Sequence, residues 1–384
     1  MKWKHTIFSF TLFLLSIVLA YTAGYFTHDR LNGTTADLNI LAQARSVLKN
    51  HAFYDLPPTS ELEYGMIRGM LQVYNDPYTR FVEPDQHELE NDSLVGSFGG
   101  IGATIDHDSE GYPILHPFPN SPASKVGILD GDRILFIDGL TISKETAMDE
   151  IVAALRGLEG DPVDLTISRP PSFDSLSFNI LRESIPLPSV TWYLAPAQAQ
   201  VGVIQINIIA ASTKGEIQNA VANLQQKGAL YFALDLRGNR GGLVDAGISI
   251  AELFLEDGDI LEEQYRGQDI KTYSVSQTGP LTDLPLVILV DENTASAAEI
   301  VAGALQARER ATIIGTKTFG KDSVQLVFDL EDNSSIHVTA AKWWIPGLGT
   351  SIGEHGIQPD IRVASGQNPD PVIEAAILFL TREP

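Results

Sequence analysis

The chain has 384 residues, with 49 acidic against 26 basic side chains and a formal net charge of −23 at pH 7. This excess of negative charge argues against binding to nucleic acid and against tight binding to an anionic lipid surface, because both carry the same sign of charge. The absence of cysteine excludes disulfides, a thiol nucleophile and thiolate metal ligands. The length exceeds that of one typical domain and predicts about two or three compact units.

The N-terminal segment has the features of a membrane anchor. Lys2 and Lys4 precede an uncharged run over residues 7–26. As a helix rising about 1.5 Å per residue, this run would reach about 30 Å, the thickness of a bilayer's hydrocarbon core. The lysines are expected on the cytoplasmic side, which places the rest of the chain in the periplasm or outside the cell. The alternative is a cleaved signal peptide with a cut near Ala20 or Ala23.

Residues 29–95 predict a small helical region. Apolar residues recur at helical spacing in two runs, separated by Leu56-Pro-Pro58. A turn at Asn75-Asp-Pro-Tyr78 follows, and the charged stretch 83–92 predicts an exposed connection. Helices with an apolar face either pack on their own domain or mediate dimerisation, and the sequence leaves this open.

Residues 96–185 change to short alternating runs separated by turns, which predict a β-rich module with one amphipathic helix over 147–155. The expected strands are 101–105, 112–115, 133–138, 163–167 and 176–180. The loop Phe98-Gly99-Gly100-Ile101-Gly102 opens the first of them. Such a glycine-rich loop can capture the terminal carboxylate of a peptide that adds to the sheet as a strand.

Residues 186–384 alternate apolar strands with helical stretches, which predicts an α/β layout with a covered sheet. The expected strands are 201–206, 230–235 and 286–290, and the expected helices are 214–226, 244–255 and 297–307. The fold class expected for the whole chain is therefore a multi-domain α/β and β protein. Its parts are an N-terminal anchor and helical segment, a β-rich module and an α/β domain.

Ser296 is the candidate nucleophile of the α/β domain. It lies in Asn293-Thr-Ala-Ser-Ala-Ala-Glu299, after an expected strand and at the start of an expected helix. Backbone N–H groups and the helix dipole favour negative charge at such a turn. Read alone, this serine is an ordinary helix N-cap.

A serine nucleophile needs a base, and the motif has no histidine in a comparable setting, since His337 and His355 are interpreted as structural. Lys321, in Thr318-Phe-Gly-Lys-Asp-Ser-Val-Gln325, can serve where burial lowers its pKa from about 10.4 toward neutrality. Read alone, Lys321 is an exposed lysine and Gln325 a neutral strand residue.

Several motifs resemble one known family. Phe98–Gly102, Ser121-Pro-Ala123 and Gly131-Asp-Arg-Ile134 resemble a PDZ domain of the C-terminal processing (tail-specific) peptidases, the S41 serine peptidase family. The resemblance extends over about residues 40–365. Its further motifs are Asn75–Phe81, Asp235-Leu-Arg-Gly-Asn-Arg-Gly-Gly242, the serine and lysine motifs, and Gly356-Ile-Gln-Pro-Asp360.

This resemblance implies a role for each candidate residue. Ser296 is the nucleophile, Lys321 the general base and Gln325 the residue that orients the lysine. The oxyanion hole uses the N–H of Ala297 and that of Gly241 or Gly242, a choice that the sequence leaves open. The PDZ loop Phe98, Gly99, Gly100, Ile101 and Gly102 binds the substrate tail. An acyl-enzyme mechanism without metal or organic cofactor follows, with the PDZ module gating the site.

The sequence departs from the family's common pattern near the lysine. Asp322 stands where glycine is usual, and an adjacent carboxylate raises the pKa of a lysine unless it points to solvent. Thr294 and Ala298 replace frequent serines, and Arg240 replaces a frequent proline.

The expected protein is an exported, membrane-anchored serine endopeptidase that acts near unstructured C-terminal tails. Expected partners are those tails, the membrane, a second copy of the chain and an activating protein, but no nucleic acid. One alternative is a catalytically inactive or activator-dependent PDZ scaffold. Another is an esterase, which would show a Gly-x-Ser-x-Gly elbow that the Ser296 context lacks. The expected domains are 1–28, anchor or signal; 29–95, helical; 96–185, PDZ; and 186–384, peptidase.

Overall fold

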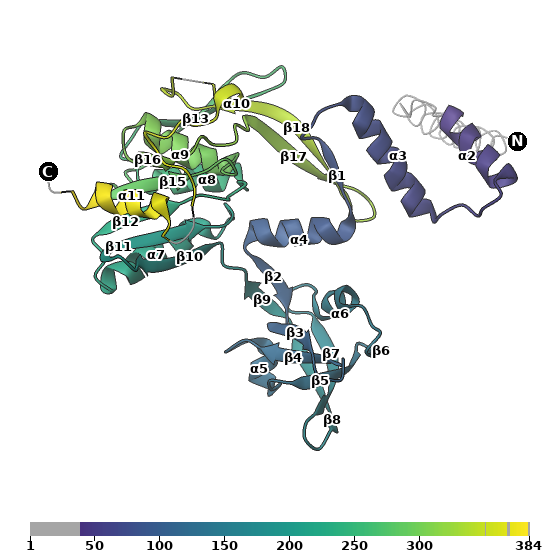
Figure 1. Ribbon diagram of the computed structural model, residues 1–384. Helices are drawn as coiled ribbons and strands as arrows, with labels where there is room; N and C mark the ends of the chain where they lie inside the picture. The colour runs from purple at the N-terminus through teal and green to yellow at the C-terminus, as the bar shows by residue number, and fades with distance from the viewer. Residues whose placement is uncertain (1–38, 350, 367–368, 383–384) are drawn as a thin grey trace, which may run out of the picture. The chain divides into compact units, whose positions relative to one another are not determined.

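The computed structural model describes residues 39–349, 351–366 and 369–382 (Figure 1). The run 7–26, interpreted as an anchor or signal, lies outside the described residues. Within the described ranges, no helix combines the length and the apolar character needed to cross a bilayer. The chain divides into two compact units between Met70 and Leu71.

The first unit contains α2 (Asn39–His51) and most of α3 (Thr59–Tyr74), which confirms the two predicted helices. Arg45 of α2 donates a hydrogen bond to the Thr59 hydroxyl at 3.3 Å. Neither helix has a buried residue. Several apolar side chains along them are exposed, among them Ile40, Val47, Leu48, Met70 and Val73.

In the second unit, one body is the predicted β-rich module. Its sheet has the strand order β3 (Ala103–His107), β4 (Pro113–Pro117), β5 (Asp132–Ile137), β7 (Pro162–Arg169) and β8 (Asp174–Leu181), with β6 (Leu140–Thr141) beside β5. The helices are α5 (Pro122–Val126) and α6 (Met148–Leu155). Leu115, Ile134 and Ile151 are completely buried in its core. All five predicted strands and the predicted helix are found.

A helix and a two-stranded ribbon lead into this module. The stretch 83–92, predicted as an exposed connection, is largely helical, because α4 spans Pro84–Val95 and ends at Gly96 with φ 86°. After it, β2 (Ser97–Gly100) pairs antiparallel with β9 (Glu183–Pro186), so the start and the end of the module run side by side. Arg156 then joins the module to α4 through Asp92 at 2.5 Å.

The predicted α/β domain is built on a six-stranded sheet. Its order is β10 (Val190–Ala195), β11 (Gln198–Ile206), β12 (Tyr231–Asp235), β15 (Leu286–Val290), β16 (Thr312–Gly315) and β19 (Ile361–Arg362). Strands β11 to β19 are parallel and β10 is antiparallel. All five residues of β15 are buried, as is typical of a parallel strand covered on both faces.

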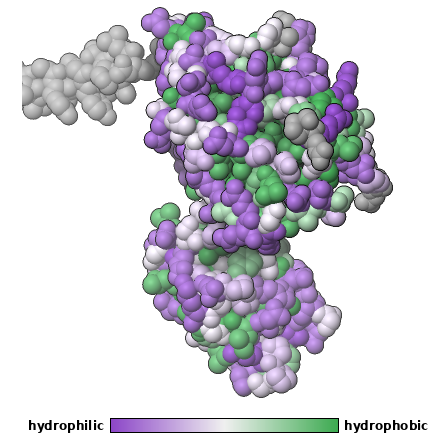
Figure 2. All heavy atoms as spheres, turned by 90° about the vertical axis from the view of Figure 1, so that its left-hand side faces the viewer, coloured by the Kyte–Doolittle hydropathy of each residue, from purple (hydrophilic) through white to green (hydrophobic). Residues whose placement is uncertain are grey.

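Helices cover both faces of this sheet. The larger core contains buried residues of α7 (Thr213–Gln226), α8 (Val244–Glu252) and α9 (Ala297–Ala307). On the opposite face, α11 (Pro371–Leu380) packs Val372 and Ala376 against alternate residues of β12, β15 and β16. On the face drawn in Figure 2, hydrophilic and hydrophobic residues are interspersed.

A second, five-stranded sheet was not predicted from the sequence. Its order is β1 (Arg80–Val82), β18 (Ser335–Trp344), β13 (Asp259–Tyr265) and β14 (Lys271–Ser274), and β17 (Ser323–Asp329) also pairs with β18. The short helix α10 (Ile352–His355) follows it in the chain. Because β17 contains Gln325 and β1 pairs with β18, this sheet brings the segment around residue 80 close to the lysine motif.

Candidate active site

Ser296 lies at the junction of β15 and α9, as the sequence predicts. It is the N-cap of α9, with φ 56° and ψ −123°. A non-glycine residue rarely adopts a positive φ, and such strain, typically about 1–3 kcal/mol, persists only where surrounding contacts impose it. The next N–H group, that of Ala297, lies in the first turn, where a helix offers no internal acceptor.

The glycine turn after β12 lies directly against Ser296. A Cβ atom on Gly241 would lie 2.8 Å from Cβ of Ser296 and 3.0 Å from the backbone nitrogen of Ala297. Gly241 also has φ 99°, so both space and conformation require glycine there. Its N–H donates to Oδ1 of Asn239 at 2.8 Å. The turn therefore brings together three of the residues that the sequence analysis selected: Gly241, Ser296 and Ala297.

Asn239 was missed by the sequence analysis. Its side chain is fully buried, and its Nδ2 donates to the backbone carbonyl of Ile206 at 2.8 Å. The backbone carbonyl of Asn239 accepts the N–H of Ala295, the residue before the candidate nucleophile, at 2.9 Å. Asn239 thus joins the end of β11, the glycine turn and the loop that precedes Ser296.

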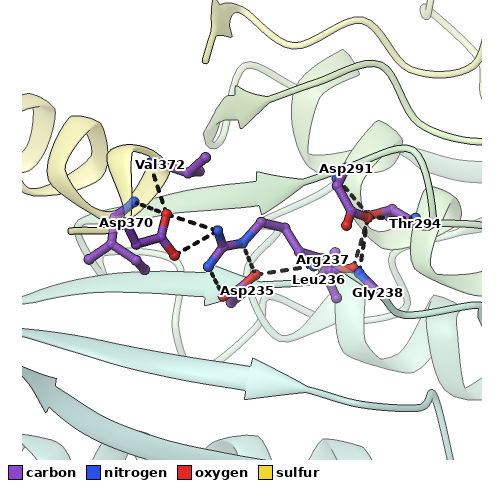
Figure 3. Close-up of polar contacts among 9 residues, drawn as sticks. Asp235, Leu236, Arg237, Gly238, Asp291, Thr294, Asp370 and Val372 are labelled. Carbon is purple, nitrogen blue, oxygen red and sulfur yellow. Dashed lines mark hydrogen bonds and ion pairs between the residues drawn. The ribbon is translucent and has the colours of Figure 1, made fainter. Parts of the chain in front are cut away.

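Asp291 makes a second connection between the same two loops (Figure 3). Its Oδ1 accepts the N–H of Gly238 at 2.9 Å and that of Thr294 at 3.0 Å. The Thr294 hydroxyl in turn donates to the carbonyl of Leu236 at 2.9 Å. Asp291 directly follows the buried strand β15. This position at the carboxyl end of a sheet strand is the sequence signal that could have identified Asp291 as a site residue.

Arg237 links the glycine turn to the C-terminal helix. Figure 3 shows its guanidinium between two carboxylates, Asp235 at 2.7 Å and Asp370 at 2.8 Å. Asp370 also caps α11 by accepting the N–H of Val372 at 3.0 Å. The hydrogen bond with Asp235 raises the pKa of Arg237. Through these contacts, Arg237 connects β12 to α11.

Lys321 lies between the loop that follows β16 and the start of β17. Its Nζ donates to Oε1 of Gln325 at 2.9 Å, so the structure brings together the predicted base and the residue predicted to hold it. Burial lowers the pKa of Lys321, and the positive charge of Arg80 lowers it further. Among the described residues, no hydrogen bond joins Nζ to the Ser296 hydroxyl, and the two residues are connected through Glu299.

Glu299 is fully buried and accepts hydrogen bonds from both motifs. Its Oε2 accepts the N–H groups of Ser296 and Lys321, each at 2.9 Å. Its Oε1 accepts the N–H of Gly320 at 2.8 Å and the hydroxyl of Thr318 at 2.5 Å. Burial raises the pKa of this carboxyl group. The sequence analysis did not select Glu299, although Ser-x-x-Glu at a helix start is a recognised capping pattern.

Asp322, the departure next to the lysine, is paired with a different residue. Its carboxylate forms an ion pair with Nζ of Lys342 at 2.6 Å. The charges that act on Lys321 are those of Arg80, Asp76 and Glu299. Asp322 therefore does not oppose the neutral form of the lysine.

His337, interpreted as structural, lies in β18 opposite Arg80. Burial, followed by the charge of Arg80, lowers the pKa of His337 to about 4. Its imidazole is therefore neutral at neutral pH. His355 is the last residue of α10.

The predicted peptide-binding loop is only partly a loop. Phe98, Gly99 and Gly100 lie in β2, and the Arg156 guanidinium covers the Phe98 ring at 4.6 Å. Ile101 is only 3 % exposed and belongs to the module's core. Gly102, with φ 71°, leads into β3, which is one of the two edge strands of the module's sheet. An edge strand is where an added peptide strand can pair.

Comparison with known proteins identifies the family. The model of peptidase family S41 matches residues 200–363, and a PDZ domain model matches residues 118–169, downstream of the Phe98–Gly102 loop. A carboxyl-terminal-processing protease of Picosynechococcus sp. is 38% identical over 337 residues, which cover 85% of this chain and 80% of that protein. The carboxy-terminal processing protease CtpA of Bacillus subtilis is 33% identical over 311 residues, covering 81% and 66% respectively.

One solved structure is also similar to the chain. The photosystem II D1 C-terminal processing protease is 29% identical, with a TM-score of 0.45, and the match covers 85% of this chain and 89% of that one. Relatives at 33–38% identity are named as carboxyl-terminal or carboxy-terminal processing proteases, and relatives from Staphylococcus aureus at 31–32% identity are named as probable CtpA-like serine proteases. The chain therefore belongs to the C-terminal processing proteases of peptidase family S41 and has the family's mixed α/β fold with a PDZ domain.

Proposed function

We propose that the chain is a serine endopeptidase in which Ser296 and Lys321 form the catalytic dyad and Gln325 holds the lysine. The observation that supports this assignment best is the environment of Lys321. Its amine is partly buried, has a lowered pKa and donates to Gln325. The backbone of the same residue is linked through Glu299 to the backbone of Ser296.

In the proposed mechanism, neutral Lys321 removes the proton from Ser296 as its Oγ attacks the substrate carbonyl carbon. The tetrahedral intermediate collapses when the lysine donates that proton to the leaving amine, which leaves an acyl group on Ser296. Water, activated by the lysine in the same way, then hydrolyses the ester and restores the dyad. Lys321 performs both proton transfers, so its neutral form must be present at the working pH.

For the oxyanion hole, we propose the N–H of Ala297 with that of Gly242. The Ala297 group is in the first turn of α9, where the helix dipole adds to the stabilisation of negative charge. The Gly241 N–H already donates to Asn239, which favours Gly242 as the second donor. Loss of one such donor typically lowers turnover by about 100- to 1000-fold.

For the PDZ domain, we propose residues 96–185, with the edge strand β3 and the Phe98–Gly102 loop binding unstructured C-terminal tails. The peptidase domain is proposed as residues 186–384 and the helical region as residues 29–95. The apolar run with its preceding lysines supports residues 1–28 as an anchor that holds the enzyme at the outer side of a membrane. Gating by the PDZ domain, self-association and an activating partner remain proposals that follow from the resemblance.

A reporter protein with an unstructured C-terminal tail tests this function. The full chain is expected to cleave it near the tail, and the Ser296→Ala variant is expected to be inactive. Amidation of the reporter's terminal carboxylate is expected to weaken cleavage, because the PDZ loop then loses the charge that it binds. Equal cleavage by the Ser296→Ala variant would contradict the nucleophile assignment. Binding of the tail without cleavage by any form would support the scaffold alternative.

A further inference from the structure

A short segment far upstream in the sequence lies against the candidate base. The amide nitrogen of Gln325 donates a hydrogen bond to the backbone carbonyl of Tyr78. The Tyr78 ring also faces the lysine, with Nζ of Lys321 5.2 Å from the ring centroid. Both members of the lysine–glutamine pair therefore contact Tyr78, a residue outside the serine, lysine and glycine motifs.

The Tyr78 carbonyl determines which end of the Gln325 amide faces the lysine. A carbonyl oxygen only accepts hydrogen bonds, so it must face the NH₂ group of the amide. Oε1 of Gln325 is then left to accept from Lys321 Nζ. The reverse orientation would place an NH₂ group against an amine and two carbonyl oxygens against each other. The contact with Tyr78 thus gives the lysine amine an acceptor in a fixed direction.

Tyr78 is itself held in place by a hydrogen-bonded turn. Its N–H donates to Oδ1 of Asp76 at 3.2 Å, and the Thr79 hydroxyl donates to Oδ2 of the same carboxylate at 2.5 Å. Oγ1 of Thr79 then accepts the N–H of Thr339 in β18 at 3.1 Å. Strand β1 begins at the next residue and pairs with β18, with Arg80 opposite His337. The Tyr78 carbonyl is therefore fixed to the sheet that contains Gln325.

Arg80, two residues after Tyr78, adds a positive charge near the lysine. Its guanidinium pairs with Glu90 at 2.6 Å and lies 3.3 Å from Nδ1 of His337. After burial, Arg80 is the strongest influence that lowers the pKa of Lys321, whereas Asp76 and Glu299 act in the opposite direction. His337, also near the lysine, is neutral at neutral pH. The neutral form of Lys321 is thus favoured by burial and by one nearby cation.

We propose that Tyr78 and Arg80 are positioning residues of the Ser-Lys site: Tyr78 orients the lysine–glutamine pair, and Arg80, held beside Glu90 and His337, places a like charge near the lysine. This inference rests on the proposed function, because it assigns a role to residues that act through Lys321. It adds the segment Asp76–Arg80 to the proposed site. Among the described residues, no hydrogen bond joins this segment to Ser296.

The test measures how fast a fluorophosphonate probe labels Ser296 in the full chain between pH 6 and 10. In Arg80→Gln, the midpoint of the rate increase is expected at a higher pH than in the wild type, because a like charge is lost. Labelling at pH 7 is then expected to be slower than in the wild type, because less of the lysine is neutral at that pH. Arg80→Lys keeps the charge and is expected to restore most of the wild-type profile. Lys214→Gln, an equal loss of charge on α7, is expected to leave the profile unchanged.

Two further variants separate charge from structure. Arg80→Gln also frees the carboxylate of Glu90, so Arg80→Gln with Glu90→Gln is the matched control and is expected to retain the upward shift. Tyr78→Phe keeps the ring and the carbonyl and is expected to label like the wild type. Tyr78→Ala removes the ring and is expected to lower the plateau rate by about tenfold. Thermal denaturation checks that each variant is folded.

The outcomes distinguish this inference from the proposed function. Labelling of the wild type that needs Lys321, combined with unshifted profiles in both variants that lack the Arg80 charge, would overturn the role of Arg80. An unchanged plateau in folded Tyr78→Ala would overturn the role of the Tyr78 ring, since this variant keeps the backbone carbonyl. Labelling of Ser296 that does not depend on Lys321, or no labelling at all, would count against the proposed dyad itself.

Discussion

Ser296 and Lys321 share one hydrogen-bond acceptor, because the backbone N–H groups of both residues donate to Oε2 of Glu299 at 2.9 Å. The proposed nucleophile and the proposed base are therefore fixed relative to each other through a buried carboxylate as well as through the fold. The positive φ of Ser296 persists in this setting, since its own N–H is one of the groups held. A change at Glu299 should accordingly affect both residues together.

Glu299→Gln is expected to lower both activity and stability. An amide NH₂ in place of one carboxylate oxygen cannot accept the hydrogen bonds that this oxygen receives, so buried N–H groups lose their partner. Each such loss destabilises a protein by about 1–3 kcal/mol. Fluorophosphonate labelling and denaturant unfolding measure the two effects. The exposed Glu256→Gln serves as the control, and a Glu299→Gln variant with wild-type labelling and stability would contradict this role.

Gly241→Ala is expected to abolish labelling of Ser296 almost completely. The new methyl group would lie 2.8 Å from Cβ of Ser296 and 2.8 Å from the carbonyl oxygen of Ala295, so the nucleophile loop must shift. Gly238→Ala is the matched control: its φ of 74° imposes similar backbone strain, but nothing lies within 4 Å of the added atom. The control is expected to lose about 1 kcal/mol of stability and to stay active. Equal activity of the two variants would contradict the close contact between Gly241 and the backbone around Ser296.

The lowered pKa of Lys321 predicts a pH-dependent effect on stability. Between its folded value and the ordinary value of 10.5, the lysine is neutral when folded and protonated when unfolded, so the free energy of unfolding rises with pH. Lys321→Met removes this dependence. The free energy of unfolding of Lys321→Met is expected to exceed that of the wild type most below the folded pKa of Lys321. This difference is expected to shrink as pH rises toward 10.5. Parallel unfolding curves for both proteins at pH 7 and pH 10 would show that the pKa is not lowered.

Asp370→Ala is expected to loosen the C-terminal helix from the glycine turn. The substitution removes the N-cap of α11 and one carboxylate partner of Arg237. Loss of a cap destabilises by about 0.5–2 kcal/mol, and Asp370→Ser, which keeps a capping oxygen without the charge, is expected to recover part of it. Thermal unfolding of the three proteins measures this ranking. No difference between Asp370→Ala and the wild type would show that Arg237 needs only Asp235.

The sequence predicted the elements that carry local signals. The apolar run of β15 followed by Ser296 and a helical pattern located α9 to the residue, since strand, turn and helix are adjacent in the chain. The lysine–glutamine contact was expected from the resemblance to the family, in which both residues belong to one motif. The five-stranded sheet was missed, because it pairs β1 with β18 across most of the second unit, and short strands with mixed polarity give little periodic signal.

The supporting residues were missed for a related reason. Glu299 and Asn239 bind backbone groups of residues distant in sequence, those of Lys321 and Ile206. Tyr78 in turn accepts a hydrogen bond from the side chain of the distant Gln325, and all these contacts depend on how the loops are brought together. The stretch 83–92 is a different case. Its charge suggested a connection, but Pro84 at the start and Gly96 at the end are helix boundary signals that identify α4.

The most direct test of the central claim is the pH dependence of tail cleavage by the full chain, compared with Lys321→Ala. The wild-type kcat/KM for a reporter with an unstructured tail is expected to rise with pH and level off below the ordinary lysine value of 10.5, because burial and Arg80 lower the pKa of Lys321. Lys321→Ala is expected to be inactive at every pH. Cleavage by folded Lys321→Ala with the wild-type pH profile would contradict the assignment of Lys321 as the base.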